Sequence, residues 1–107
     1  MNTIVFTGKL IADVRINKGE KGNFMSFTLF ETGKGENMPK LECTQSFKGE
    51  DAPKIAEWLK KFATVAVSGT PYAKLGKDKD GNAVAVQAAF VDKIDICAFS
   101  PKTETQE

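Results

Sequence analysis

Aromatic and lysine side chains are interleaved along this chain in a pattern that suits contact with single-stranded nucleic acid. Bases stack on aromatic rings with little sequence preference, each stacked base contributes about 1–3 kcal/mol, and lysine ammonium groups follow the phosphates. The aromatic candidates are Phe24, Phe30, Phe47 and Tyr72. The lysine candidates, in or beside expected loops, are Lys18, Lys21, Lys34, Lys40, Lys74 and Lys77. Together these side chains form the predicted nucleic-acid-binding surface.

The same residues also have simpler interpretations. Phe24 and Phe30 could fill a core or a subunit interface, and Phe47 lies on a strand whose apolar side could equally point inward. In the stretch that contains Lys74 and Lys77, nearby aspartates cancel much of the charge. A solvated loop explains that stretch as well as a phosphate contact does.

The composition narrows the chemistry. The chain has 107 residues, a net charge of +1 and no histidine, which excludes histidine-based catalytic triads and histidine metal sites. Cys43 and Cys97 are too few for a structural zinc site, so free thiols in a reducing cytoplasm are expected, with a disulfide as the alternative. Arg15 is the only arginine, and lysine favours backbone contact over base reading.

The carboxylates give no sign of an active site. They are scattered among the expected strands: Asp13, Glu31, Glu42, Asp92 and Asp95. A metal-dependent nuclease would need several of them to converge with a lysine, and their spacing does not require this. We therefore predict no catalytic residue, no metal and no cofactor.

Alternating apolar residues predict a mostly β domain that would carry these side chains. Strands are expected over 3–14, 23–32, 40–47, from 64 onward, and over 83–97, with a polar turn at 17–22 and loops at 33–39 and 73–82. Gly8 is where the first strand can bend to serve both halves of a barrel. The second strand has large apolar residues on both faces, Phe27 among them, so one face fills the barrel and the other exposes rings.

One helix is expected over 52–62, between the third and fourth strands. Its apolar residues at i, i+3, i+4 and i+7 are Ile55, Trp58, Leu59 and Phe62. Asp51 is the predicted N-cap, and Trp58 is expected to close the bottom of the barrel. One helix at this place in a β chain is the layout of an OB-fold, a five-stranded Greek-key barrel that binds single-stranded nucleic acid.

The domain boundaries follow from the same patterns. Residues 1–98 are predicted to form the OB-fold domain, and 99–107 a short flexible tail. The N-terminus lacks the pattern of a signal peptide, and no stretch is apolar for long enough to cross a membrane. A cytoplasmic protein, in a bacterial cell or a phage-infected host, is expected.

The sequence resembles the bacterial-type single-stranded DNA-binding protein family. The matching pieces, in order, are Asn2 to Leu10 with Gly8-Lys9-Leu10, Phe27-Thr28-Leu29, Phe47-Lys48-Gly49, and Ile55 to Lys61 continued by Val65 to Gly69. The resemblance implies a non-catalytic OB-fold protein that assembles into dimers or tetramers. It also implies that the protein wraps single-stranded DNA during replication, recombination and repair. The family's strand-three phenylalanine matches Phe47.

The sequence departs from the family in two respects. The family's tryptophans fall near Leu41 and near Leu75 or Gly76, which depletes the stacking platform and leaves Phe24, Phe30 and Tyr72 as substitutes. No acidic tip that recruits other proteins is recognisable in the last residues, which suggests a phage or mobile-element member or a stripped-down accessory copy.

Two hypotheses of different class remain. The first is sequence-independent binding of single-stranded DNA, by base stacking and lysine–phosphate contacts. The second is an OB-fold protein-interaction or replisome adaptor module with weak or no DNA binding, similar to primosomal replication protein N. Under either hypothesis the protein is expected to be a homodimer or homotetramer, because self-association would bury the apolar residues that lie on both faces of the strands.

Overall fold

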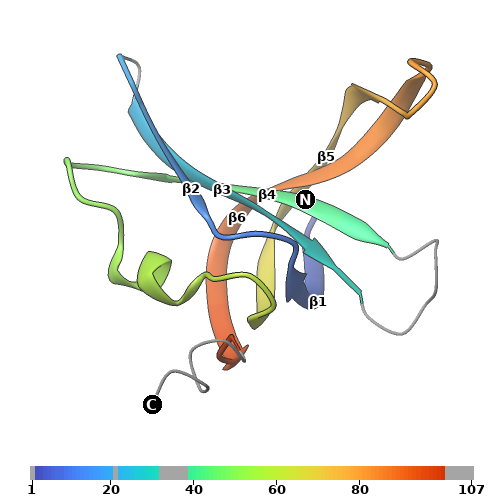
Figure 1. Ribbon diagram of the computed structural model, residues 1–107. Coiled ribbons are helices and arrows are strands. Elements are labelled where there is room, and N and C mark those ends of the chain that lie inside the picture. Colours follow the sequence, from blue (N-terminus) through green and yellow to red (C-terminus); the bar gives the residue numbers. More distant parts are fainter. Residues whose placement is uncertain (1, 21, 32–38, 101–107) are drawn as a thin grey trace.

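A computed structural model describes residues 2–20, 22–31 and 39–100 of the chain. Its elements are β1 (Ile4–Leu10), β2 (Arg15–Gly19), β3 (Gly22–Phe30), β4 (Lys40–Phe47), η2 (Lys54–Trp58), β5 (Thr64–Lys77) and β6 (Ala83–Ala98). The strands form one sheet in the order β1-β5-β6-β4-β3-β2 (Figure 1). β1 also pairs with β3, so five strands close into a ring, and β2 continues the sheet beyond β3. The predicted mostly β chain is confirmed, and its closed five-stranded ring is consistent with an OB-fold.

Gly8 allows β1 to serve both sides of the ring. β1 pairs with β5 from Ile4 to Lys9 and reaches β3 at Lys9 and Leu10. A Cβ at Gly8 would lie 2.5 Å from the carbonyl oxygen of Phe30, so only glycine lets the strands approach this closely. The single strand predicted over 3–14 is wrong in extent, because the chain bends after Leu10 and restarts as β2.

The predicted polar turn at 17–22 is also shorter than expected. β2 pairs with β3 in antiparallel register from Arg15 opposite Ser26 to Gly19 opposite Gly22. Polar side chains were the reason for predicting a turn, but this hairpin lies outside the barrel, where polar strand residues face solvent on both sides.

The barrel interior takes alternate residues from each strand. On β3 these are Met25, Phe27 and Leu29, as their spacing predicts. The other members of the buried cluster are Leu10, Leu41, Cys43, Leu59, Ala63, Val65, Val67, Ala89 and Val91. The opposite residues of β3 and β4 therefore face outward and are available for binding.

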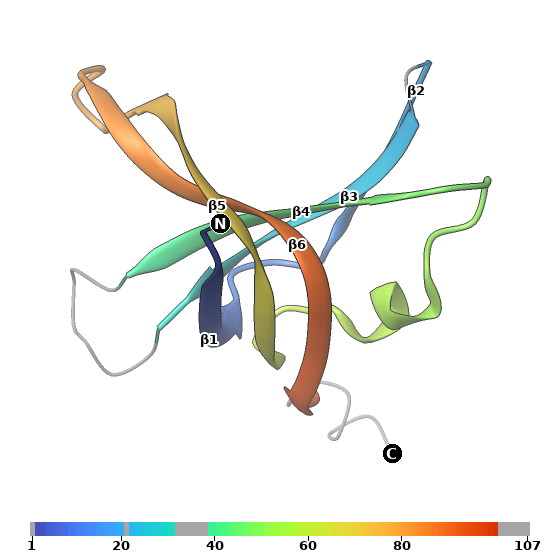
Figure 2. The same cartoon turned by 180° about the vertical axis from the view of Figure 1, so that it is seen from behind.

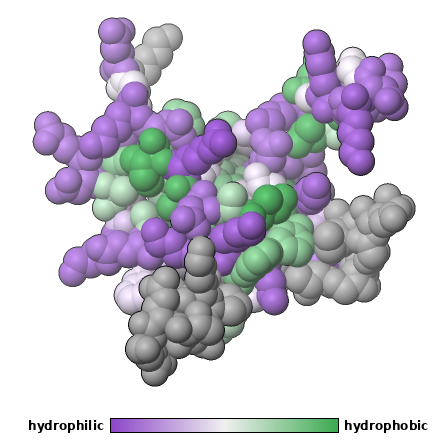
Figure 3. All heavy atoms as spheres, in the orientation of Figure 1, coloured by the Kyte–Doolittle hydropathy of each residue, from purple (hydrophilic) through white to green (hydrophobic). Residues whose placement is uncertain are grey.

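Two hairpins extend from the barrel on opposite sides (Figure 2). One is formed by β2 with the start of β3, and the other by the end of β5 with the start of β6. Their tips carry mainly hydrophilic side chains, and apolar surface lies between them (Figure 3). The hairpins thus flank the outer face of the sheet.

The β5–β6 hairpin corrects the loop predicted over 73–82. Residues 73–77 belong to β5 and pair with 83–87 of β6, so only the last part of the predicted loop is a turn. That turn matches its Asp-Gly-Asn signal: Gly81 has φ 81°, and Asp78 Oδ1 accepts bonds of 2.9 Å from the N–H groups of Asp80 and Asn82. The alternating charges that favour a loop in the sequence belong to a solvent-exposed hairpin.

The α-helix predicted over 52–62 is wrong. Its place is taken by η2, a five-residue 3-10 helix whose N-cap is Pro53, with no side-chain capping bond from Asp51. The following backbone is bonded to the β1–β2 connection instead: Val14 N–H donates to Leu59 O, and Phe62 N–H donates to Leu10 O, each at 2.9 Å. A continuing α-helix would need these two groups for its own bonds, so tertiary pairing overrides the helical periodicity.

The expected role of Trp58 changes with the helix. Leu59 and Ala63 are fully buried and close this end of the barrel, whereas Trp58 is 45% exposed. The Trp58 ring lies against Phe99, with 5.1 Å between ring centroids. Among the described residues, no helix is long and apolar enough to cross a membrane.

Phe62 has a left-handed backbone conformation, which yields a stability prediction. Its φ of 70° is unusual for a residue with a Cβ and costs roughly 1–2 kcal/mol, whereas glycine adopts it freely. The ring is exposed, and Lys61 Nζ lies 5.1 Å from its centroid. Phe62→Gly and Phe62→Ala both remove the ring. We expect the glycine variant to unfold at a higher urea concentration than the alanine variant, with a free energy of unfolding about 1 kcal/mol larger. An equally stable alanine variant would show that the left-handed conformation is not retained.

Candidate nucleic-acid interface

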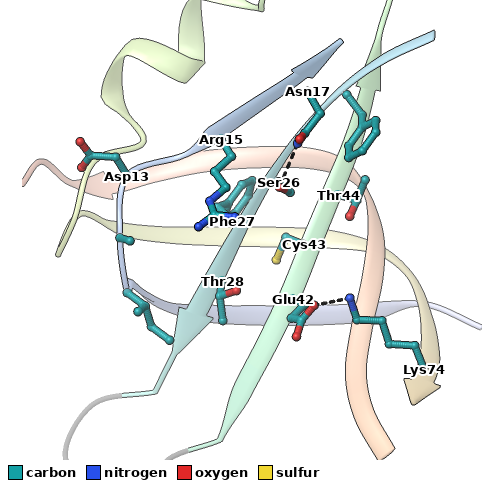
Figure 4. Close-up of a pocket in the computed structure, with 13 residues that line it drawn as sticks. Asp13, Arg15, Asn17, Ser26, Phe27, Thr28, Glu42, Cys43, Thr44 and Lys74 are labelled. Carbon is teal, nitrogen blue, oxygen red and sulfur yellow. Dashed lines mark hydrogen bonds and ion pairs between the residues drawn. The ribbon is translucent and has the colours of Figure 1, made fainter. Parts of the chain in front are cut away.

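The outward face of the sheet carries a cavity of about 510 Å³, here called the outer groove. Its lining comes from the β1–β2 connection and from β2, β3, β4 and β5 (Figure 4). The lining residues are Ile11, Ala12, Asp13, Arg15, Asn17, Phe24, Ser26, Phe27, Thr28, Glu42, Cys43, Thr44 and Lys74. Most of them are polar, so the groove is a polar surface and not an apolar ligand pocket.

Strand register aligns side chains across this face in rows. Arg15 is opposite Ser26, Ser26 is opposite Thr44, Thr44 is opposite Phe90, and Phe90 is opposite Thr70. Directly opposed residues of paired strands point to the same face of a sheet. The row therefore crosses β2, β3, β4, β6 and β5. It begins with the Arg15 guanidinium, continues with the hydroxyl groups of Ser26 and Thr44, and reaches the Phe90 ring before it ends at Thr70.

A second row adds the other ring. Thr28, Glu42, Ala88 and Tyr72 are successive partners across β3, β4, β6 and β5. The Tyr72 ring stacks on Phe90, with centroids 4.4 Å apart and an angle of 19° between the planes. Phe90 remains 56% exposed, so the pair, here called the aromatic platform, offers a flat apolar surface beside the outer groove.

The four predicted aromatic residues take different positions. Tyr72 belongs to the aromatic platform, and Phe24 lines the outer groove with 38% of its surface exposed. Phe30 is half-buried at the end of β3, opposite Lys9 and Lys40 and outside the lining of the groove. Phe47 packs against the barrel core, which was the alternative that its strand left open. A role in binding remains a prediction for each of them.

The predicted lysines are spread over the molecule. Lys74 lines the outer groove, whereas Lys18, Lys40 and Lys77 are exposed on β2, β4 and β5 outside its lining. Lys21 and Lys34 lie outside the described residues. Of the four predicted lysines that the structure describes, one thus lines the groove, and Arg15 supplies a second cation there.

Lys74 is paired within the groove. Its Nζ lies 2.5 Å from Glu42 Oε1, and the hydrogen bond and charge of Glu42 raise the pKa of Lys74.

The cysteines of the chain are free thiols. Cys43, next to Glu42 in the sequence, is buried. Burial is the main cause that raises the pKa of its thiol to about 12, and the charge of Glu42 adds to it. Since the thiolate is the reactive form, Cys43 is an inert core residue at neutral pH. Cys97 is free and exposed, which agrees with the expected free thiols.

Hydrogen bonds fix the two central strands of this face. Gln45 Nε2 donates to the carbonyl oxygens of Val91 and Asp92 at 3.3 and 3.4 Å, which ties β4 to β6 beyond their short parallel ladder. Asn17 Nδ2 donates to Ser26 Oγ at 3.3 Å and ties β2 to β3. These bonds hold neighbouring strands of the face together. Within the described ranges, no cluster of side chains suited to a metal ion is present.

Comparisons with known proteins agree with this architecture. Neither a protein-family model nor a curated protein matches the sequence. Solved structures do match. A small single-stranded DNA-binding protein from Streptomyces coelicolor is similar with a TM-score of 0.72 and 14% identity, over 89% of this chain and 93% of that one. A mitochondrial single-stranded DNA-binding protein from S. cerevisiae has a TM-score of 0.68 and 12% identity, over 92% of this chain and 97% of that one.

The chain has the fold of single-stranded DNA-binding proteins. At these identities the likeness concerns the fold, and a phage or mobile-element source stays a prediction. Within this fold, Phe90 and Arg15 lie on the candidate face but are not among the residues predicted from the sequence. Phe90 is brought to the face by the parallel pairing of β4 with β6, which no local pattern reveals. For Arg15, being the only arginine was the one available signal.

Proposed function

We propose that this protein binds single-stranded DNA without sequence specificity and catalyses no reaction. The observation that carries the proposal is the aromatic platform of Tyr72 and Phe90 beside a groove that contains two cations, Arg15 and Lys74. Solved structures with the same fold are single-stranded DNA-binding proteins, which supports the choice of ligand.

The proposed mechanism separates base contacts from phosphate contacts. Bases stack on the platform and on Phe24, because every base presents a π face. Arg15 and Lys74 contact the phosphates. The hydroxyl groups in the groove, Ser26 and Thr44 among them, both donate and accept hydrogen bonds and so tolerate any base edge.

We further propose that the protein acts in DNA replication, recombination or repair as a homodimer or homotetramer. Large apolar side chains remain exposed on the single chain, including Val5 on β1 at 73% and Leu75 on β5 at 83%. Self-association would cover part of this surface. Sedimentation or light scattering would measure the oligomeric state directly.

An adaptor module is the second candidate, favoured by a different surface. The Trp58 and Phe99 rings are 45% and 50% exposed, and neither lines the outer groove. Exposed aromatic residues of this kind are common anchors in protein–protein interfaces. An adaptor would use these rings and would bind DNA weakly or not at all.

Fluorescence anisotropy of labelled oligo-dT at several salt concentrations separates the two functions. Phosphate contacts on single strands give a slope of about −0.7 per contact in log K against log salt. Two such contacts, from Arg15 and Lys74, would thus lower the affinity roughly 7-fold between 50 and 200 mM. We expect this steep dependence, together with weaker binding of a duplex of equal length. No binding at 50 mM salt would contradict the proposal and favour the adaptor.

A further inference from the structure

The lysine in the outer groove is already neutralised by a carboxylate of the same chain. Lys74 Nζ lies 2.5 Å from Glu42 Oε1, and the two side chains point toward one another across the face in Figure 4. Both line the groove, and they remain 48% and 38% exposed. If the groove binds a polyanion, the Glu42 carboxylate therefore already forms an ion pair with Lys74 before the polyanion arrives.

We propose that Glu42 is an internal competitor for Lys74 that sets the affinity of the outer groove. A bound phosphate takes over Lys74, and the released Glu42 carboxylate then faces the backbone of the nucleic acid and repels it. This inference rests on the proposed function, since it presumes that an anionic strand enters the groove. Its chemical core is an exchange of one anion for another on a single ammonium group.

The exchange is physically easy because the ion pair is partly exposed. Ion pairs in contact with solvent are weak and are screened by salt, so a phosphate can displace the carboxylate. Glu42 is also centrally placed: it is opposite Thr28 on one side and Ala88 on the other, in the row that ends at Tyr72. A strand that stacks on the aromatic platform therefore passes close to its carboxylate.

The pair does not hold the strands together. β6 lies between β4 and β5 and pairs with both, and its ladder with β5 extends from Thr64 to Lys77, so backbone pairing joins these strands. Asp13, the other carboxylate of the groove, differs in this respect, because its Oδ1 accepts the backbone N–H of Lys61 at 2.8 Å. Asp13 is a structural group, whereas Glu42 is free to exchange.

Glu42→Gln tests the proposal because it removes the charge and keeps the shape. We expect oligo-dT to bind about 3- to 10-fold more tightly, and the salt slope to steepen by about 0.7, as for one added phosphate contact. Glu57→Gln is the matched control, because it makes the same change of net charge at an exposed residue of η2 outside the groove. In a Lys74→Gln background the gain from Glu42→Gln should shrink, because the two residues are coupled.

The outcomes separate this inference from the function on which it rests. If wild type binds and Glu42→Gln binds equally or more weakly, Glu42 is no competitor. If Glu57→Gln tightens binding equally, the effect is one of net charge, which also overturns the proposal. If folded wild type and folded variant both fail to bind, the proposed function itself is wrong. Circular dichroism confirms folding, and Glu42→Thr, with a residue suited to strands, serves if the glutamine variant does not fold.

Discussion

Replacing Phe90 with alanine should weaken oligo-dT binding about 5- to 150-fold, the loss that corresponds to one stacking contact of about 1–3 kcal/mol. Phe90 is 56% exposed and stacks on Tyr72, and it is opposite Thr44 in the outer groove. The substitution removes the exposed half of the aromatic platform and leaves Tyr72 without its partner ring. Because the Phe90 side chain lies outside the buried core, the fold should persist, which anisotropy combined with a thermal melt would show.

Phe99→Ala is the matched control for this prediction. Phe99 is 50% exposed and also contacts another aromatic ring, that of Trp58, but it does not line the outer groove. We expect its removal to leave DNA affinity unchanged. If Phe99→Ala weakened binding and Phe90→Ala did not, the interface would lie on the surface around Trp58, and the outer groove would not be the binding site.

Local periodicity accounts for the part of the fold that could be predicted from the sequence. The bounds expected for the third strand coincide with β4, and the alternation of Met25, Phe27 and Leu29 predicts the buried face of β3. In both strands, one face lies against the core, so burial imposes a period of two on the sequence. Gly8 could be identified because a barrel strand that serves two neighbours needs a position without a Cβ.

The errors arose where distant backbone decides the structure. The segment 52–62 has a helical period, but hydrogen bonds from Val14 and to Leu10 fix its second half as an irregular chain. The end of β5 looks like a charged loop, yet it pairs with the start of β6. Neither partner is visible in the segment itself, so composition favoured the wrong assignment.

The candidate site divides in the same way. Phe24 reaches the outward face as alternation predicts, because the buried residues of its strand are clear, whereas the place of Tyr72 on that face follows from the pairing of β5 with β6. Phe47 belongs to the same strand as Leu41 and Cys43 and follows their parity into the barrel. Phe90 could not be found, because its place beside Thr44 depends on a parallel pairing between strands far apart in sequence.

Gly69 links the stability of the barrel to the position of Phe90. The register between β5 and β6 shifts between Ser68 and Gly69, and the strands approach so closely there that a Cβ on Gly69 would overlap the carbonyl oxygen of Phe90. We expect Gly69→Ala to lower the free energy of unfolding by about 2–3 kcal/mol, at the upper end of overpacking costs, because backbone must move. For a domain of this size that is a fall in Tm of roughly 10 °C or more.

Gly76→Ala provides the comparison, because its Cβ would meet a side chain in place of backbone. The nearest atom there is Cγ2 of Val86, 2.7 Å away, on the exposed β5–β6 hairpin, and a valine can rotate or shift at small cost. Urea unfolding of both variants should therefore show a large loss for Gly69→Ala and a loss below about 1 kcal/mol for Gly76→Ala. Equal losses would mean that a Cβ added at either glycine of β5 is equally harmful and that the close approach at Gly69 has no special role. A folded Gly69→Ala variant should also bind oligo-dT more weakly, because displacement of the Phe90 carbonyl group moves the ring that bases stack on.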